Sequence, residues 1–257
     1  MLMIRGCRFD MTGPSTQALP KFLAETKYQN ITSKHETVFQ KAFHTDLSFF
    51  EWLPQHPQHV KSLGNLMALD RPTYWVDSYP VAELLGSLAT KPEKAVLVDI
   101  GGGFGQQAVA FRNKFPDLPG RVVVQDIPST LAGAKPVQGV EFMEYDFFGA
   151  QSITDAKLYY LRHVLHDWPD AECVRILKNV IRAMGPESRL IIDDVVMLER
   201  GAHWQATFMD LLMMNNLGAL ERTRVEWDAL LDQAGLKVID VHQYDPKMQS
   251  VLITVPK

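Results

Sequence analysis

Short apolar runs alternate with helical patterns over the second half of the chain, and this alternation limits the folds that it can adopt. Five runs rich in valine, isoleucine and leucine cover residues 95–100, 121–126, 140–146, 157–164 and 189–197. Strands that alternate with helices form parallel βαβ units. Two further runs, 236–244 and 248–256, are separated by a short Asp-Pro-Lys turn and must pair antiparallel. We therefore expect an α/β fold, a doubly wound seven-stranded sheet with a C-terminal antiparallel hairpin and one reversed strand near its edge.

The first 92 residues follow a different pattern, and we divide the chain at this point into 1–92 and 93–257. Helical patterns cover residues 16–23, 33–43, 47–53, 59–69 and 81–88. Pro20, Pro54 and Pro57 are expected to interrupt them. Aromatic residues are dense here, where they would pack the helices together or line a pocket.

The composition is that of a globular protein without a basic surface. The 257 residues are 46% hydrophobic and 22% charged, with a formal net charge of -4. This charge gives no reason to expect binding to nucleic acid or acidic lipid. Cys7 and Cys173 lie far apart, which argues against a disulfide framework and fits a reducing compartment. Residues 1–13 lack the apolar stretch of a secretory signal, and no long apolar run occurs, so we expect a cytoplasmic protein that crosses no membrane.

A glycine-rich loop follows the first predicted strand. Gly101, Gly102, Gly103 and Gly105 stand between the run 95–100 and a helical pattern. Such glycines let the backbone approach a ligand closely and direct the N–H groups of the helix start toward it. Glycine-rich turns also occur for purely structural reasons, so the loop alone identifies no ligand. It lacks the Gly-Lys-Ser/Thr ending of a loop that serves triphosphate hydrolysis.

Acidic residues at the ends of the next two strands narrow the choice of ligand. Asp126 follows the glycine loop by about 20 residues, where a carboxylate can bind both hydroxyls of a ribose. Asp146 and Phe147 end the third run and suit the amino group and ring of an adenine. Because open α/β sheets bind ligands at the carboxyl ends of their strands, we predict an adenosine derivative. These residues do not distinguish a dinucleotide from S-adenosylmethionine.

The fourth run leads into the segment LRHVLHDWPD at residues 161–170. His166 would lie at the carboxyl end of a strand beside the predicted ligand, where an imidazole can act as a general base near neutral pH. Alternatively, His166 caps the following helix or packs in the core. His163 is a second histidine three residues away, but no third ligand is evident, and we expect no metal site.

Six motifs with this order and spacing resemble the plant-type small-molecule O-methyltransferases, especially their relatives in fungal secondary metabolism. They are VLVDIGGGFGQ (96–106), VVVQDIP (122–128), EYDFF (144–148), LRHVLHDWPD (161–170), IIDDVVML (191–198) and LGALERT (217–223). FFEWL (49–53) and NLMALDR (65–71) are also similar to that family. The resemblance covers roughly residues 17–257. It implies a Rossmann-like, S-adenosylmethionine-binding catalytic domain at 93–257, preceded by a helical linker and substrate-pocket segment at 1–92.

The resemblance also implies roles for individual residues. His166 would take the proton of an aromatic or polyketide-like hydroxyl as its oxygen attacks the methyl group of S-adenosylmethionine, which leaves S-adenosylhomocysteine. Asp194 and Glu221 would flank and orient His166. Asp194 is shorter than the glutamate often found there in plant members, so its contact is expected to be looser. The implied cofactor contacts are Asp99, Gly101, Gly103, Asp126, Asp146, Phe147 and Arg162. The implied substrate contacts are Phe50, Trp52, Asn65, Met67, Met213 and Asn216.

Members of that family normally begin with a winged-helix-like domain that forms an intertwined dimer, and this chain starts near the linker that follows it. We therefore expect a weakened homodimer or association with a homologue. Two other functions remain open on the sequence. One is a same-fold enzyme that binds S-adenosylmethionine without transferring its methyl group and catalyses pericyclic or dehydration chemistry. The other is a non-catalytic partner of a full-length homologue. The presence of His166, Asp194 and Glu221 favours methyl transfer.

Overall fold

The computed structural model describes residues 7–67, 73–84 and 86–257, and its first part is helical. The elements of this part are η1 (Cys7–Thr12), α2 (Gly13–Glu25), α3 (Val38–Phe43), α4 (Phe49–Trp52), η2 (Leu53–Gln55), α5 (Pro57–Met67), α6 (Trp75–Ser78) and α7 (Val81–Leu84). An aromatic cluster joins several of them. The ring of Phe39 lies 4.6 Å from that of Phe43 and 5.4 Å from those of Phe49 and Trp52, measured between centroids.

Two predictions about these helices are wrong. The helix expected at 33–43 begins only at Val38, because Thr37 caps it: its hydroxyl accepts from the N–H of Phe39, and its own N–H donates to Gln40. Pro20 does not interrupt its helix, since α2 continues through it. A proline inside a helix costs about 3 kcal/mol, and the packing of α2 against α3 and α11 offsets that cost.

Other boundaries shift by smaller amounts. The helix expected at 47–53 is α4 followed by the single turn η2, and the helix expected at 81–88 ends at Leu84. The helix expected at 59–69 can be followed only to Met67, because its last residues lie outside the described residues. The same holds for part of the motif at 65–71 and for residues 1–6 of the segment that was examined for a secretory signal.

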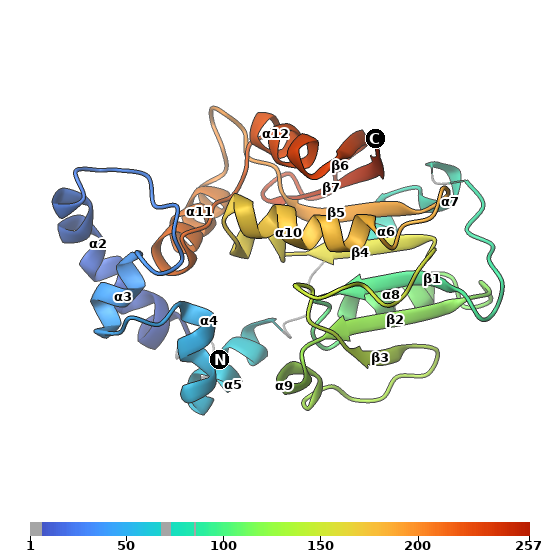
Figure 1. Cartoon of the computed structure of the whole chain (residues 1–257), viewed down its shortest axis with the longest axis horizontal. Coiled ribbons are helices and arrows are strands. Elements are labelled where there is room, and N and C mark those ends of the chain that lie inside the picture. The colour runs from blue at the N-terminus through green and yellow to red at the C-terminus, as the bar shows by residue number, and fades with distance from the viewer. Residues whose placement is uncertain (1–6, 68–72, 85) are drawn as a thin grey trace.

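Seven strands form one sheet in the order β3-β2-β1-β4-β5-β7-β6 (Figure 1). They are β1 (Ala95–Ile100), β2 (Arg121–Asp126), β3 (Glu141–Glu144), β4 (Leu158–Arg162), β5 (Arg189–Val195), β6 (Leu236–Gln243) and β7 (Gln249–Pro256). The first five pair in parallel, whereas β7 pairs antiparallel with both β5 and β6. The predicted doubly wound sheet with one reversed strand near its edge is confirmed.

Helices cover both faces of this sheet. The later helical elements are α8 (Gln106–Lys114), α9 (Pro128–Leu131), η3 (Leu165–Asp167), α10 (Asp170–Ile181), α11 (Trp204–Leu217) and α12 (Arg224–Ala234). Neighbouring side chains of β4 point to opposite faces, as the period of a strand requires. Tyr159 packs in the core beneath α10 and α12, and Tyr160 packs in the core beneath α6 and α8.

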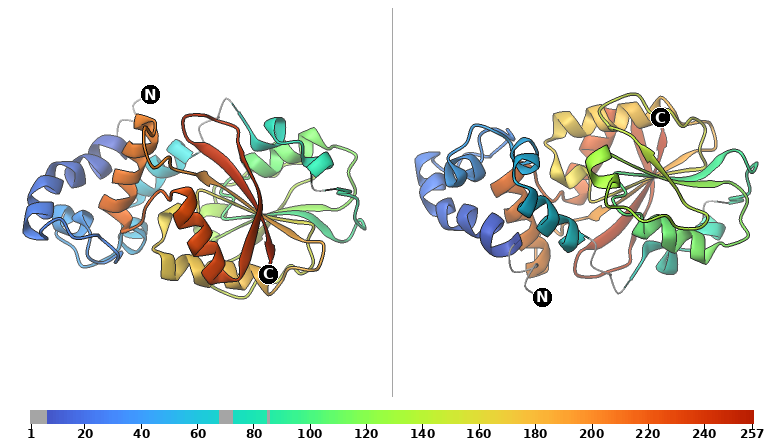
Figure 2. Two further views of the ribbon diagram at one scale, coloured as in Figure 1. Left: turned by 90° about the horizontal axis from the view of Figure 1, so that it is seen from above. Right: turned by 90° about the horizontal axis from the view of Figure 1, so that it is seen from below.

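Helices α2 to α5 lie at one end of the sheet, beyond the carboxyl ends of its parallel strands (Figure 1). Helix α11 comes late in the chain but lies against α2 and α3 (Figure 2). The helical part is therefore built from the N-terminal segment together with one helix of the C-terminal half. A Cβ atom on Gly64 of α5 would lie 3.7 Å from the ring of Phe104 in the glycine loop. The helical part therefore borders the predicted ligand site. Within the described ranges, no helix has the length and apolar character needed to span a membrane.

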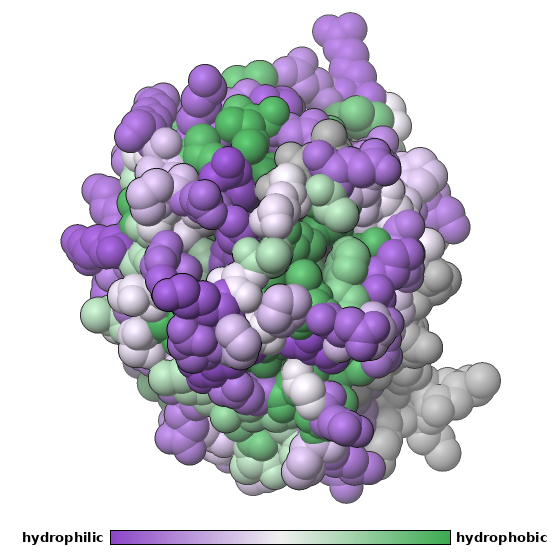
Figure 3. Space-filling model, turned by 90° about the vertical axis from the view of Figure 1, so that its right-hand side faces the viewer, coloured by the Kyte–Doolittle hydropathy of each residue, from purple (hydrophilic) through white to green (hydrophobic). Residues whose placement is uncertain are grey.

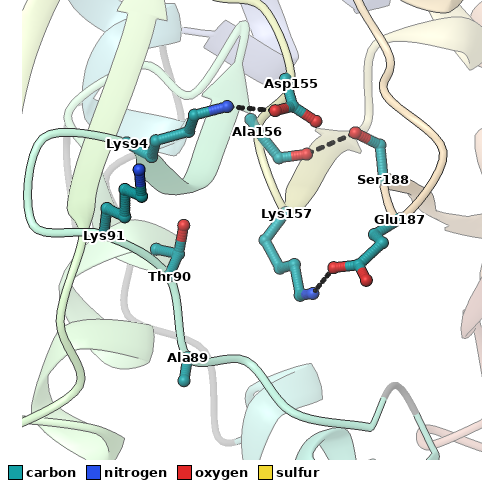
Figure 4. A pocket seen from close by; sticks show the side chains of 9 residues that line it. All are labelled: Ala89, Thr90, Lys91, Lys94, Asp155, Ala156, Lys157, Glu187 and Ser188. Atoms are coloured by element: carbon teal, nitrogen blue, oxygen red, sulfur yellow. Dashed lines mark hydrogen bonds and ion pairs between the residues drawn. The ribbon is translucent and has the colours of Figure 1, made fainter.

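The opposite edge of the sheet carries a small hollow of about 210 Å³, lined by the loops that precede β1, β4 and β5 (Figure 4). Lys94 pairs with Asp155 there, and Lys157 with Glu187 at 2.6 Å. The surface seen from this end is mainly hydrophilic, with smaller groups of apolar side chains between (Figure 3). Both carboxylates that line this hollow are thus paired with a lysine.

Candidate active site

The glycine loop is tied to the end of β2. The N–H groups of Gly101 and Gly102 both donate to the carbonyl of Gln125, over 2.7 and 3.2 Å. The N–H of Gly103 donates to the carboxylate of Asp126 over 2.9 Å, and that of Gly105 to the carbonyl of Gly102. These four amides already have acceptors inside the protein, whereas the N–H groups expected to face a ligand are those at the start of α8, and that expectation stays a prediction. The loop instead offers a ligand a close approach to the backbone.

Gly101 has a steric reason to be glycine. Its φ is +67°, and a Cβ atom there would come within 2.8 Å of the side chain of Val164 and 3.8 Å of the ring of Phe147. Gly103 also has a positive φ, +59°, but a Cβ would meet nothing within 4 Å. The Phe147 ring thus lies directly beside the loop, where the sequence predicted an aromatic face for an adenine.

Asp99, at the end of β1, is a buried carboxylate that is incompletely satisfied. Its side chain is 1% exposed, and its Oδ2 has no hydrogen-bond partner among the residues that the structure describes. Burial, reinforced by the nearby charge of Asp126, raises the pKa of Asp99 to about 7. A buried acceptor without a donor is costly and suggests a missing partner. A cationic group of a ligand would satisfy it.

The other predicted cofactor residues gather at the same edge of the sheet but already have protein partners. Asp126 accepts from the N–H groups of Gly103 and Ile127. Asp146 accepts from the N–H of Phe148 over 2.9 Å, which closes a turn just past β3.

Arg162 ends β4, and its guanidinium donates to Asp193 and to the hydroxyl of Tyr244. Asp193 also accepts from Tyr160, so the arginine belongs to a mainly buried polar network under the sheet edge. These contacts explain Arg162 as a structural residue, and the predicted cofactor contact stays a prediction.

His166 lies in η3, immediately beyond β4, and three carboxylates surround its ring. Nδ1 is 2.8 Å from Oε1 of Glu221, in hydrogen-bonding geometry, and 3.6 Å from Oδ1 of Asp194. On the other side of the ring, Nε2 is 3.4 Å from Oδ1 of Asp167. The structure thus brings together the three predicted catalytic residues, and the longer Asp194 contact agrees with the looser grip expected of the shorter side chain.

The carboxylates determine the charge on this imidazole. Burial alone would lower the pKa of His166, but Glu221 above all, then Asp194 and Asp167, raise it to about 10. For the two aspartates burial acts in the opposite direction, because it disfavours the charged carboxylate. It raises the pKa of Asp194 to about 7 and that of Asp167 to about 6. The Glu221 hydrogen bond leaves Nε2 as the ring nitrogen available for proton transfer.

The expectation that no third ligand lies near His163 and His166 is wrong. Oδ1 of Asp194 is 3.6 Å from Nδ1 of each histidine, and one ligand atom from each of the three residues lies within 4.8 Å of the others. Because β4 and β5 are parallel neighbours, their carboxyl ends meet at the same edge. The sequence separation of Asp194 from the histidines concealed this contact.

Arg222 was not recognised from the sequence. Its fully buried guanidinium donates to the carbonyls of Leu165 and Trp168, each over 3.0 Å, and to Asp170 over 2.7 Å. These acceptors stand on both sides of His166, so Arg222 fixes the segment that carries the base. Its position next to Glu221 was the available signal.

An aromatic contact joins the helical part to the same segment. Phe50 stacks on Trp168 with ring centroids 5.3 Å apart, and the edge of Phe147 faces Trp168 at 6.0 Å. Phe50 therefore lies near the catalytic segment, as expected of a pocket residue. Trp52 instead packs inside the helical part, 3.6 Å from the ring of His56 and near Phe39. Its contacts are those of a core residue.

The remaining predicted substrate residues divide in the same way. Asn65 and the 55% exposed Met67 lie at the end of α5, close to the glycine loop. Met213 of α11 packs against the aromatic cluster of the helical part. Asn216 accepts from Ser15 over 2.8 Å and donates to the carbonyl of Leu212 over 2.9 Å. For Met213 and Asn216, packing accounts for the contacts seen.

Comparison with known proteins agrees with this arrangement. A family model described as an O-methyltransferase domain matches residues 29–237. The chain belongs to the O-methyltransferase family. It is 61% identical over 249 residues to demethylsterigmatocystin 6-O-methyltransferase of Aspergillus parasiticus, a match that covers 97% of this chain and 64% of that protein. It is 51% identical to the O-methyltransferase okaF of Penicillium ochrochloron over 97% of this chain and 66% of that protein.

Solved O-methyltransferase-like structures share the fold. The structure of LepI with SAM superposes with a TM-score of 0.93 at 39% identity, over 97% of this chain and 65% of that chain. OxaC in complex with SAH and oxaline gives a TM-score of 0.86 at 31% identity, over 96% of this chain and 63% of that chain. The chain thus spans a little under two thirds of the length of most of these relatives.

Proposed function

We propose that this chain is an S-adenosylmethionine-dependent O-methyltransferase that methylates a phenolic hydroxyl of a polyketide-type metabolite, with His166 as the general base. The observation that carries the proposal is the buried His166, held through Nδ1 by Glu221 at 2.8 Å at the carboxyl edge of the sheet. The O-methyltransferase names of the relatives support the reaction type.

The residues at the glycine loop fit S-adenosylmethionine. Oδ2 of Asp99, which lacks a donor among the described residues, matches the ammonium group of the cofactor. The Phe147 ring lies beside Gly101, where it offers an aromatic face to an adenine, and the second lone pairs of the Asp126 oxygens suit ribose hydroxyls. When bound, the cofactor supplies an activated methyl group on a sulfonium. Solved relatives contain SAM and SAH, which supports this assignment.

The task of His166 is to accept the hydroxyl proton at Nε2 as the acceptor oxygen becomes nucleophilic. Glu221 accepts the hydrogen bond from Nδ1–H and so fixes the ring orientation and tautomer. Asp194 adds negative charge that stabilises the imidazolium formed. General-base catalysis of this kind typically contributes about 10²- to 10⁴-fold in rate, and alignment of the two reactants supplies the rest.

Two observations support the proposed class of methyl acceptor: the names of the relatives and a group of aromatic rings beside His166. Demethylsterigmatocystin 6-O-methyltransferase acts, by its name, on a polyketide-type hydroxyl. In this chain Phe50, Trp168 and Phe147 form a connected group of rings beside the catalytic segment. Flat aromatic acceptors suit such surroundings. Asn65 and Met67 are proposed to line the outer part of the same pocket.

The direct test measures transfer of isotope-labelled methyl from S-adenosylmethionine to a panel of phenolic polyketides. The His166→Ala variant should still gain thermal stability with S-adenosylhomocysteine but should lose at least 100-fold in kcat. Asp228→Asn is the control, because Asp228 pairs with Arg224 on the exposed side of α12, and it should keep its turnover. Full turnover by the His166→Ala variant would refute the base assignment.

A second candidate has one observation in its favour. A structure described as a pericyclic reaction enzyme superposes with a TM-score of 0.94 at 39% identity. Under this reading the chain would bind S-adenosylmethionine and rearrange a substrate without methylating it. The intact His166–Glu221 pair favours methyl transfer, and the labelling experiment separates the two, since a pericyclic enzyme leaves no label in its product.

The organisation proposed for the protein is a helical linker and pocket segment at 1–92 followed by the catalytic domain at 93–257. Homodimer formation, or pairing with a homologue, and a cytoplasmic location complete the proposal. Analytical ultracentrifugation of the chain alone and mixed with a homologue tests the association.

A further inference from the structure

Methyl transfer to a hydroxyl releases one proton per turnover, and the site must return that proton to water. The inference here rests on the proposed function. On the Nδ1 side of His166, the path is closed, because the side chains of Glu221 and Asp194 are 0% and 1% exposed. On the Nε2 side lies Asp167, with Oδ1 at 3.4 Å and a side chain that is 16% exposed. Asp167 is the carboxylate of the three that reaches both the ring and solvent.

The distance between Nε2 and Asp167 also implies a proton between them. Nδ1–H donates to Glu221, so Nε2 carries either a lone pair or a second hydrogen. A lone pair that faces a carboxylate oxygen at 3.4 Å would be repelled. The contact is favourable when the ring is an imidazolium or when Asp167 is protonated. In either state, one of the two groups carries a proton that the other can receive across this 3.4 Å contact.

Other charged groups face the ring or its carboxylates and set the charge at this position. Glu221 precedes α12, Asp194 comes from β5 and His163 follows β4, and each faces His166 or its carboxylates. Asp210 of α11 accepts from the backbone N–H of Glu221, and Arg222 faces Asp194. Burial raises the pKa of Asp167 well above that of an ordinary aspartate, to about 6. This pKa is still below the value of about 10 for His166, so the transfer to Asp167 is uphill and release of the proton to water must draw it forward.

We propose that Asp167 is the proton outlet of the active site: it accepts the reaction proton from Nε2 of His166 and passes it to water. The proton that leaves the acceptor hydroxyl first bonds to Nε2. The N–H bond then breaks as the proton moves to Oδ1 of Asp167, which restores the neutral imidazole. Release of that proton to solvent restores the carboxylate. Every proton taken from an acceptor is thus accounted for without a further reactant.

The experiment compares kcat of the intact chain and of Asp167→Asn at fixed pH and ionic strength over a range of formate concentrations. The amide cannot accept the proton, so the variant should lose about tenfold or more in kcat, and formate should restore part of that loss in proportion to its concentration. The original protein and Asp228→Asn, a control on the exposed face of α12, should not respond to formate. Protection by S-adenosylhomocysteine should be the same for all three proteins.

If Asp167→Asn keeps the original kcat, or loses activity that formate does not restore, Asp167 is no proton outlet. Asp167→Ser is the second variant if the asparagine protein does not fold, and it leaves more space for formate. Failure of the proposed function gives a different result, because then the original protein transfers no methyl group or His166→Ala retains full turnover.

Discussion

Glu221 and Arg222 are consecutive in the chain, yet they hold His166 in two separate ways. Glu221 accepts from the ring at 2.8 Å, whereas Arg222 donates to the main-chain carbonyls of Leu165 and Trp168 on either side of the histidine. Thr223 then caps α12 through the N–H of Glu226. One tripeptide thus orients the His166 ring, anchors the segment that carries it and caps α12.

Replacing Arg222 with methionine should destabilise the protein by about 3 kcal/mol, because the buried carbonyls of Leu165 and Trp168 lose their donors. Urea unfolding followed by fluorescence measures the loss. Arg224→Met is the control, since the pair of Arg224 with Asp228 is half-exposed and should contribute less than about 1 kcal/mol. Equal losses in the two variants would contradict the anchoring role.

Asp99→Asn should stabilise the ligand-free protein and abolish cofactor binding. The folded-state pKa of Asp99 is raised to about 7 from its ordinary value of 3.8, so between these values the folded state holds a proton that the unfolded state has lost. Stability therefore falls as pH rises through this window. The asparagine variant should lack this contribution, an effect on the order of a few kcal/mol at pH 8. Thermal melts from pH 4 to 8 with and without S-adenosylhomocysteine give both results, and a variant still protected by the ligand would contradict the assignment.

Gly101→Ala should impair cofactor binding much more than Gly103→Ala. Both residues have a positive φ, so both substitutions share the backbone strain. Only at Gly101 would the new methyl group come within 2.8 Å of Val164. Isothermal titration with S-adenosylhomocysteine should show a loss of tenfold or more in affinity for Gly101→Ala relative to Gly103→Ala. Similar affinities would mean that the loop does not closely border the ligand.

Glu221→Gln should lower kcat and move the acid limb of the pH profile of kcat/KM to lower pH. Removing the negative charge beside Nδ1 removes the largest contribution that raises the pKa of His166, so the ring becomes neutral at a lower pH. The raised pKa also favours the folded state below the unfolded-state value, and this stabilisation is lost as pH rises through the folded-state pKa. If the acid limb of the kcat/KM profile lies at the same pH in the original protein and in Glu221→Gln, a group other than His166 titrates there.

Trp52→Ala should cost about 3–5 kcal/mol in stability, as expected for a large aromatic in a core. Trp52 contacts Phe39, Phe43 and His56 within the helical part. Phe50→Ala should cost less stability and instead raise KM for a phenolic acceptor. Chemical denaturation and steady-state kinetics separate the two roles, and a rise in KM alone for Trp52→Ala would restore its predicted place in the pocket.

The sequence was sufficient to predict two kinds of feature: the strands, which appear as repeated apolar runs, and the polar residues at the ends of those strands. The apolar runs identified all seven strands, and the acids that end two of them placed Asp126 and Asp146 at one edge, whereas Asp99 and Asp194 came from the family resemblance. His166 and Glu221 were found through motif resemblance, and the structure brings them into hydrogen-bonding distance.

Other features depend on contacts that no local pattern encodes. Pro20 stays helical because of packing from distant helices, and the Arg222 contacts with the segment of His166 span more than fifty residues of sequence. Asp167 is adjacent to His166 in sequence, but only the turn η3 brings its carboxylate to Nε2. The side-chain partners of Trp52 and Asn216 likewise emerged only from the assembled fold.

The position of β7 between β5 and β6 has a consequence for synthesis on the ribosome. Residues 249–256 are the last strand to be made, but they occupy an interior place in the sheet. Until they emerge, β5 exposes an open edge next to Asp194, and β6 has no neighbour. Asp194 therefore gains its final neighbours in the sheet only after residues 249–256 have emerged.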